Sequence, residues 1–232
     1  MLAILYSVNL TQTRTVNKKP ENAILFLYEG DTELGFYDTL FDMLNLNGVA
    51  QIKKKCLKTG YNLNKLVWER IYDYLENKSN KHVKYLTVFV AYDRETKRDD
   101  PDYENRLNKQ LIIKETGSKR LKGIHEIVAT QMLESWFFID IEGIYKYLKT
   151  PASKQKIHRY KAYENFRHED LNALFMEVDK RNHYQKGDTA KKFIKELDLL
   201  KIYRQCEDLK QGIDSIFMTA GLKLPPTTSS KK

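Results

Sequence analysis

Candidate strands and candidate helices alternate along the first two thirds of the chain. Candidate strands cover residues 23–28, 49–57, 84–93 and 123–131. The first is a continuous apolar run, which is typical of a strand buried on both faces, and 84–93 is apolar and β-branched through its middle. Between the strands, apolar residues recur every three or four positions, as in amphipathic helices. This alternation predicts an α/β fold with a mostly parallel sheet flanked by helices.

The first candidate helix follows the first strand directly. It is expected to begin at Asp31, whose carboxylate can cap it, and to end at Gly48. Further helices are expected over residues 63–75, 102–115 and 132–148. The apolar stripe of the first helix consists of Leu34, Tyr37, Leu40, Phe41 and Leu44.

The pattern changes after residue 151, where strands cease and lysines become frequent. Residues 170–180, 188–200 and 202–218 each show a helical stripe. We therefore expect an N-terminal appendage over 1–20, an α/β domain over 21–151 and a helical extension over 152–222 packed on that domain. A disordered tail is expected over 223–232.

Composition places the chain among soluble globular proteins. It has 232 residues, of which 41% are hydrophobic and 31% are charged. No stretch approaches the roughly 20 apolar residues that span a bilayer, and residues 1–10 lack the features of a signal peptide. Cys56 and Cys206 have no metal or redox spacing, so buried thiols in a reducing cytoplasm are expected.

The formal net charge of +9 suggests an anionic partner, nucleic acid first. Lys156, Arg159 and Lys161 lie among aromatic residues, a combination that suits the backbone and exposed bases of a nucleic acid. A solvated, partly packed segment is the commoner explanation. Residues 52–58 (IKKKCLK) are most simply a strand edge guarded by lysines.

Acidic residues stand at the ends of three candidate strands. Glu29 ends the first strand, and Glu33 lies four positions on, in the first turn of the next helix. Asp93 ends the third strand, Glu95 follows two residues later, and Glu134 opens the segment after the fourth. The carboxyl ends of parallel strands meet at one edge of a sheet, so these five acids are expected to converge there.

Clustered carboxylates repel one another unless a cation neutralises them. Hard oxygen ligands suit Mg²⁺ or Mn²⁺, and two such ions about 3.5–4 Å apart can clamp a phosphodiester. Taken one at a time, the acids are more simply structural. Asp31 and Glu33 can serve a helix N-terminus, Asp93 and Glu95 can belong to a polar turn, and Glu134 can lie on a helix surface. Their joint placement favours a metal site.

Three segments resemble a known family. EGDTE (29–33), AYDRE (91–95) and QMLESWFFID (131–140) look like the TOPRIM fold of the Old-like nucleases and of small stand-alone TOPRIM proteins in bacterial anti-phage systems. YQKGDTAKKFIKELD (184–198) resembles the lysine-bearing segment downstream of the acids in these proteins. The resemblance covers roughly residues 22–217 and implies a TOPRIM-like, Rossmann-like sheet.

The resemblance also implies roles for the matching residues. Glu29 and Glu33 would hold one metal ion, and Asp93, Glu95 and Glu134 would hold or bridge to a second. Lys186 would supply positive charge to the scissile phosphate or the leaving oxygen. The usual D-x-D appears here as D-R-E, and the longer side chain of the glutamate moves one metal ligand. Arg94 between the two acids could contact a phosphate or form an ion pair.

The function implied is two-metal hydrolysis of DNA or of RNA such as tRNA, by the effector subunit of an anti-phage system. Old-like enzymes carry an ABC/SMC-type ATPase, whereas this chain has no G-x-x-x-x-G-K-[ST] sequence. The ATPase would then be a separate protein that controls this cytoplasmic subunit, and a homodimer is compatible with such an assembly. The alternative is a non-catalytic module whose acids bind a regulatory ion or the partner ATPase.

Overall fold

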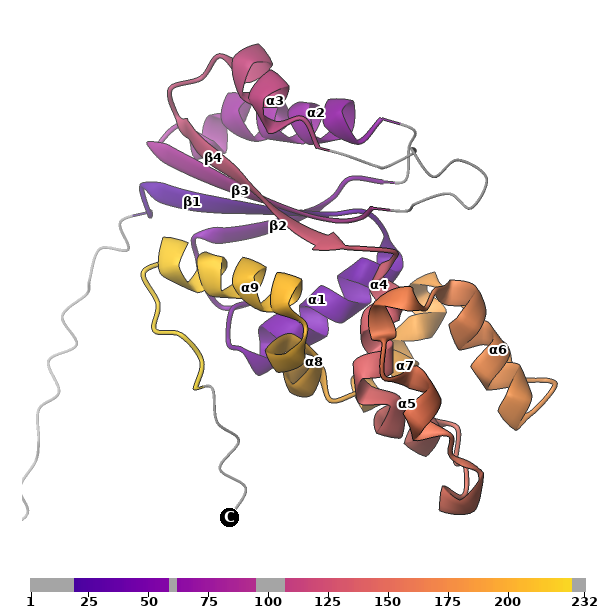
Figure 1. The fold of residues 1–232 in the computed structure, drawn as a ribbon. Coiled ribbons are helices and arrows are strands. Elements are labelled where there is room, and N and C mark those ends of the chain that lie inside the picture. The colour runs from indigo at the N-terminus through magenta and orange to yellow at the C-terminus, as the bar shows by residue number, and fades with distance from the viewer. Residues whose placement is uncertain (1–18, 59–61, 95–106, 227–232) are drawn as a thin grey trace, which may run out of the picture.

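A four-stranded, all-parallel sheet lies at the centre of the protein (Figure 1). The computed structural model describes residues 19–58, 62–94 and 107–226. The strands follow the order β2-β1-β3-β4 and comprise β1 (Asn22–Tyr28), β2 (Ile52–Cys56), β3 (Tyr85–Asp93) and β4 (Leu121–Ala129). This arrangement confirms the predicted α/β, Rossmann-like architecture.

Helices cover both faces of the sheet, and successive residues of the strands point into two separate cores. Helices α2 (Leu63–Glu76) and α3 (Lys109–Thr116) cover one face (Figure 1). Helices α1 (Asp31–Met43) and α9 (Glu207–Thr219) lie against the other. Because β1 and β3 are buried on both faces, buried apolar residues occupy successive positions over 23–28 and 88–92.

The strand order creates a switch point between β1 and β3. From β1 the chain passes through α1 to the edge strand β2, whereas from β3 it passes through α3 to the opposite edge, β4. Helices α1 and α3 therefore leave neighbouring strands toward opposite faces. In open parallel sheets a crevice forms beyond the carboxyl ends of the strands at such a point.

Shorter helices complete the face that α1 covers. They are α4 (Leu133–Phe137), α5 (Ile141–Tyr147), α6 (His168–Val178), α7 (Ala190–Glu196) and α8 (Leu199–Gln205), with 3₁₀ turns between several of them. One buried apolar cluster joins their side chains to β1, α1 and α9. Residues after 151 thus share a core with the sheet.

The prediction of one continuous helix over 132–148 is wrong. The segment is divided into α4, a 3₁₀ turn at 138–140 and α5. The buried carboxylate of Asp140 accepts hydrogen bonds from the Asp198 backbone N–H (2.8 Å) and the Lys201 ammonium (3.2 Å). Asp140 also leaves helical backbone geometry, with φ −106° and ψ 52°. These distant contacts turn the chain where local periodicity predicts continuation.

Other local expectations also need correction. Asp31 does not cap α1: Gly30 occupies the cap position without a side-chain hydrogen bond, and Asp31 is the first helical residue. The stripe expected over 202–218 is divided at Cys206 between α8 and α9. Cys206 is buried as expected, but Cys56 is only partly buried.

Some expectations fall outside the described part of the chain. Most of the N-terminal appendage (1–20), residues 102–106 of the helix expected over 102–115 and the end of the tail (223–232) lie there, and within the described residues that helix begins at Lys109. Within the described residues, none of the helices combines the length and apolarity needed to cross a membrane.

Candidate metal site at the carboxyl edge of the sheet

Glu29 and Asp93 meet at the switch point. Glu29 follows β1 and Asp93 ends β3, the neighbouring parallel strand. The Glu29 Oε2 atom accepts a hydrogen bond from the Asp93 backbone N–H at 3.2 Å. Asp93 Oδ1 in turn accepts one from the backbone N–H of Leu133, the first residue of α4, at 2.8 Å. Asp93 therefore links the end of β3 to α4, the helix that carries Glu134.

The carboxylate side chain of Glu134 is almost completely buried. Its exposed fraction is only 1%. Its Oε1 atom accepts a hydrogen bond from the Tyr184 hydroxyl at 3.2 Å. Its Oε2 atom is buried without any hydrogen-bond partner and lies 3.6 Å from the Lys186 Nζ atom. Burying a carboxylate oxygen without a hydrogen bond costs free energy, so a cation close to Glu134 Oε2 is favourable.

Glu33 is the fourth acid of the site, beside Glu29, Asp93 and Glu134, and the charges of these acids influence one another's ionisation. Burial, followed by the charge of Glu134, raises the pKa of Glu33, while backbone hydrogen bonds and Lys186 oppose that rise. Burial also raises the pKa of Asp93 well above its usual range, and the charges of Glu33, Glu134 and Glu29 add to the effect. The four carboxylates therefore share one electrostatic environment in which negative charge is unfavourable.

The segment that carries Lys186 is fixed against the acids by its neighbours. The Gly187 backbone N–H donates a hydrogen bond to the buried Thr32 hydroxyl at 2.7 Å. Tyr184 is anchored through its own backbone N–H, which donates to Asn172 Oδ1 at 3.0 Å. Lys186 lies between these two anchors, with 45% of its side chain exposed. Its ammonium is thus held near Glu134 while remaining accessible from solvent.

Thr32 and Tyr184 belong to this site but escape sequence reasoning. Tyr184 is one of 15 tyrosines, and its local sequence does not distinguish it. Thr32 lies between the candidate ligands in EGDTE, but only the fold shows that it accepts a hydrogen bond from a residue far along the chain. The signal available was proximity to Lys186 and Glu33 in sequence.

Two of the residues named with the acids lie apart from them or outside the described chain. Glu95 is outside the described residues. Arg94 donates its backbone N–H to the Ala129 carbonyl at 2.9 Å, and it lines a cavity near β4 together with Lys109, His125 and Asp208. Arg94 therefore borders a different hollow of the surface.

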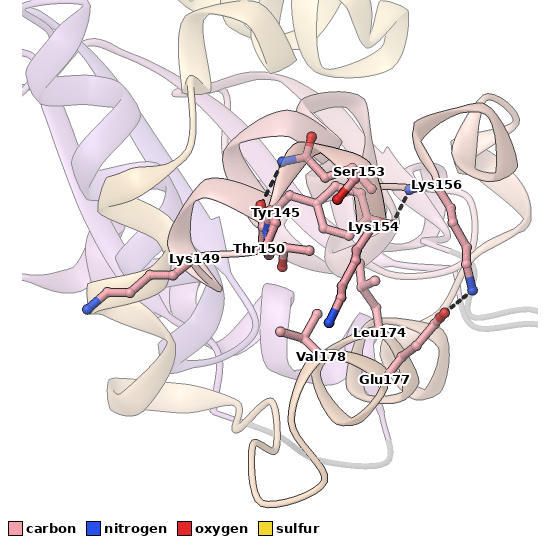
Figure 2. A pocket seen from close by; sticks show the side chains of 11 residues that line it. Tyr145, Lys149, Thr150, Ser153, Lys154, Lys156, Leu174, Glu177 and Val178 are labelled. Atoms are coloured by element: carbon pink, nitrogen blue, oxygen red, sulfur yellow. Dashed lines mark hydrogen bonds and ion pairs between the residues drawn. The ribbon is translucent and has the colours of Figure 1, made fainter.

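The basic and aromatic stretch beginning at Lys156 forms a separate surface beside α6. The Lys156 ammonium contacts the Glu177 carboxylate (Figure 2), and Arg159 Nη1 lies 3.4 Å from the same carboxylate. Lys161 is exposed. The ring of Tyr160 is buried and stacks on Phe138, with ring centroids 5.2 Å apart. That aromatic side chain serves the core and is not presented to a ligand.

The acids fit a divalent ion by their chemistry. They offer carboxylate oxygens, which Mg²⁺ and Mn²⁺ prefer, and they include the buried Glu134 Oε2 atom that lacks a hydrogen bond. Within residues 19–58, 62–94 and 107–226, however, no three His, Cys, Asp or Glu side chains already stand in a metal-ligating arrangement.

Comparisons with protein-family models, curated proteins and solved structures gave no match for this chain.

Proposed function

We propose that this protein is a nuclease that hydrolyses phosphodiester bonds of DNA or RNA with Mg²⁺ or Mn²⁺. The observation that carries the proposal is the meeting of Glu29, Glu33, Asp93 and Glu134 at the switch point of the sheet. Their mutual repulsion is unfavourable in the ion-free protein and would be relieved by a divalent cation. A purely structural role explains this arrangement less well.

The roles of the residues follow from their positions and from the resemblance described above. Glu29 and Glu33 would hold one ion, and Asp93 and Glu134 would hold a second, joined by Glu95. When bound, such ions activate a water molecule and stabilise negative charge on the phosphate. Lys186 would add positive charge where the phosphate lies, because its ammonium is both fixed near the acids and accessible.

Tyr184 would act as a positioning residue. Its hydroxyl donates to Glu134 Oε1 at 3.2 Å, and its ring is only 5% exposed and packs on Phe175 and Phe193. A carboxylate held at one oxygen keeps the other directed toward the remaining acids. Preorganisation of this kind reduces the cost of assembling a ligand shell.

The biological setting forms part of the proposal and is supported only by the resemblance of residues 29–33, 91–95, 131–140 and 184–198. The protein would be the effector of a bacterial anti-phage system in the cytoplasm, controlled by a separate ABC/SMC-type ATPase. Uncontrolled cleavage of nucleic acid would be toxic, which gives such control a purpose.

A non-catalytic module is the second candidate. One observation favours it: the Lys186 ammonium lies 3.6 Å from Glu134 Oε2 and already offsets part of the charge of the acids. In that case the acids would bind a regulatory ion or basic residues of a partner ATPase.

A cleavage assay separates the two candidates. Purified protein is incubated with plasmid DNA, single-stranded DNA and tRNA in the presence of Mn²⁺, Mg²⁺ or EDTA. We expect cleavage with Mn²⁺ that is abolished by EDTA and by Glu29→Gln, and retained by Glu196→Gln, a change of the same kind at an exposed acid on α7. Intact substrates under every condition, with and without the partner ATPase, would support the non-catalytic module.

A further inference from the structure

A basic groove lies between the edge strand β2 and helix α2. It has a volume of about 700 Å³, and its lining includes Lys53, Lys55, Lys58 and Arg70. The first three are exposed. In the described part of the chain, none of these three ammonium groups has an ion pair or hydrogen bond. Three uncompensated positive charges thus share one concave surface.

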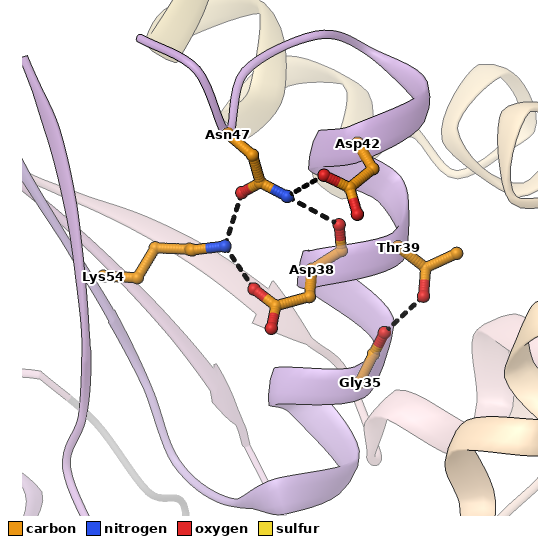
Figure 3. Close-up of polar contacts among 6 residues, drawn as sticks. All are labelled: Gly35, Asp38, Thr39, Asp42, Asn47 and Lys54. Atoms are coloured by element: carbon orange, nitrogen blue, oxygen red, sulfur yellow. Dashed lines mark hydrogen bonds and ion pairs between the residues drawn. The ribbon is translucent and has the colours of Figure 1, made fainter. Parts of the chain in front are cut away.

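The neighbouring Lys54 shows how the strand divides its lysines between two faces. The Lys54 ammonium contacts the carboxylate of Asp38 and the amide oxygen of Asn47 on the α1 side (Figure 3). It also lies 5.5 Å from the centre of the Phe41 ring. Side chains alternate along a strand, so Lys53 and Lys55 point to the opposite face. Among Lys53, Lys54 and Lys55, it is Lys54 whose ammonium contacts α1 and holds β2 against it.

Arg70 forms the wall of the groove and is itself fixed. Its Nε atom donates to the Cys56 carbonyl at 3.1 Å, and its Nη1 atom lies 3.7 Å from Asp73 Oδ2. Asp73 also lines the groove, so this acid offsets the charge of Arg70 and leaves the lysines uncompensated.

One end of the groove, at Cys56 and Lys58, lies at the carboxyl edge of the sheet. Strand β2 runs parallel to β1, so the path from Lys53 to Lys58 runs toward the carboxyl edge of the sheet. At that end the Cys56 thiol donates to the Glu29 carbonyl at 3.3 Å, and the Leu57 backbone N–H donates to the Tyr28 carbonyl at 2.8 Å. Cys56, at this end of the groove, is therefore hydrogen-bonded to the backbone of Glu29.

We propose that this groove binds the phosphodiester backbone of a nucleic-acid strand and guides it toward the carboxylates. Lys53 and Lys55 lie about 7 Å apart along the strand axis, so that a polyanion with regularly spaced phosphates can contact both. Ammonium groups contact phosphates without reading base edges, so binding is independent of sequence. The proposal deepens the nuclease function, and rests on it only for what happens to the strand once bound.

The competing explanation is that these lysines merely prevent other strands from pairing with the open edge of β2. That explanation accounts for the charge at the edge. It does not account for a groove that ends at Cys56, which is hydrogen-bonded to the backbone of Glu29. The two explanations predict different results when the lysines are neutralised.

The experiment measures binding without catalysis. Fluorescence anisotropy follows a short fluorescein-labelled single-stranded DNA, and the RNA of the same sequence, in EDTA over a range of NaCl concentrations. The test variant is Lys53→Gln/Lys55→Gln/Lys58→Gln. The control is Lys114→Gln/Lys119→Gln/Lys195→Gln, which removes the same charge from exposed positions elsewhere. Thermal melting checks that both variants fold.

We expect the groove variant to bind either oligonucleotide about tenfold or more weakly, and its plot of log affinity against log salt to be less steep by about 2. The control variant should match the wild type. A groove variant that binds like the control would overturn the proposal, as would self-association of that variant with unchanged binding, which is the result expected of an edge guard. Absence of binding by the wild type would also overturn it.

The cleavage assay distinguishes the failure of this proposal from that of the nuclease function. If the groove variant loses binding while the wild type shows no cleavage, the groove stands and the catalytic function fails. If the wild type cleaves and the groove variant binds and cleaves equally well, the function stands and the groove proposal fails.

Discussion

At the scale of single residues, Asp93 lies where a negative charge lowers the stability of the folded protein. The pKa of Asp93 is raised by burial and by the charges of Glu33, Glu134 and Glu29. A carboxyl group whose pKa rises on folding contributes stability while protonated, and loses that contribution as the pH rises through the folded pKa. Ionisation of Asp93 therefore destabilises the folded protein unless a cation binds.

Asp93→Asn should stabilise the ion-free protein in a pH-dependent manner. The asparagine amide oxygen can still accept the Leu133 N–H, while the buried charge is removed. In EDTA we expect a higher Tm than the wild type at about pH 8 and a smaller difference at about pH 5, because burial and the neighbouring carboxylates raise the pKa of Asp93. Equal loss of stability at both pH values would contradict this.

Tyr184→Phe should weaken the support of Glu134. The variant keeps the buried ring but loses the hydroxyl that donates to the carboxylate, and a hydrogen bond to a charged group contributes about 1.5–3 kcal/mol. Urea unfolding in EDTA should show a loss of that order. Tyr147→Phe, at a ring that is 36% exposed, serves as the control and should change little. Equal effects at both positions would argue against a specific role.

At the scale of elements, sequence reasoning succeeds where the determinant is local. The apolar runs identify all four strands, and parallel pairing then brings the strand-end residues Glu29 and Asp93 together, as expected. It fails at Asp140, because the partners of that carboxylate lie 58 and 61 residues further along the chain. Tyr184 is missed for the same reason, since its partner Glu134 is 50 residues away.

The contact of α9 with β4 depends on a glycine. A Cβ atom placed on Gly212 would lie 2.4 Å from Ile127 Cγ1, and Ile127 is buried in the core. Gly212→Ala should therefore displace α9 and cost about 1–3 kcal/mol of unfolding free energy. Gly48→Ala is the control, because nothing lies within 4 Å of its added Cβ. Chemical denaturation that shows no difference between the two variants would contradict this packing.

At the scale of the whole molecule, one core joins the beginning and the end of the described chain. The apolar cluster under the sheet contains Ile24 from β1 and Phe217 from α9, with α7 and α8 between them. A sheet face stripped of these helices would expose a large apolar surface. The boundary expected at residue 151 therefore separates elements that depend on one another for burial.

Removal of residues 152–232 should abolish cooperative folding. We expect the remaining fragment to lack a sigmoidal thermal transition and to show poorly dispersed amide resonances, whereas the full chain unfolds in one transition. A fragment that melts cooperatively and gives a dispersed spectrum would show that residues 21–151 form an independent domain.

We expect the acids at the carboxyl edge of the sheet to form a site for divalent cations. Isothermal titration calorimetry with Mn²⁺ tests it most directly, comparing the wild type with Glu134→Gln, which removes the charge of the buried carboxylate while keeping its size. Saturable binding by the wild type and at least about tenfold weaker binding by the variant are expected. Absence of binding by the folded wild type, or equal affinity in the variant, would contradict it.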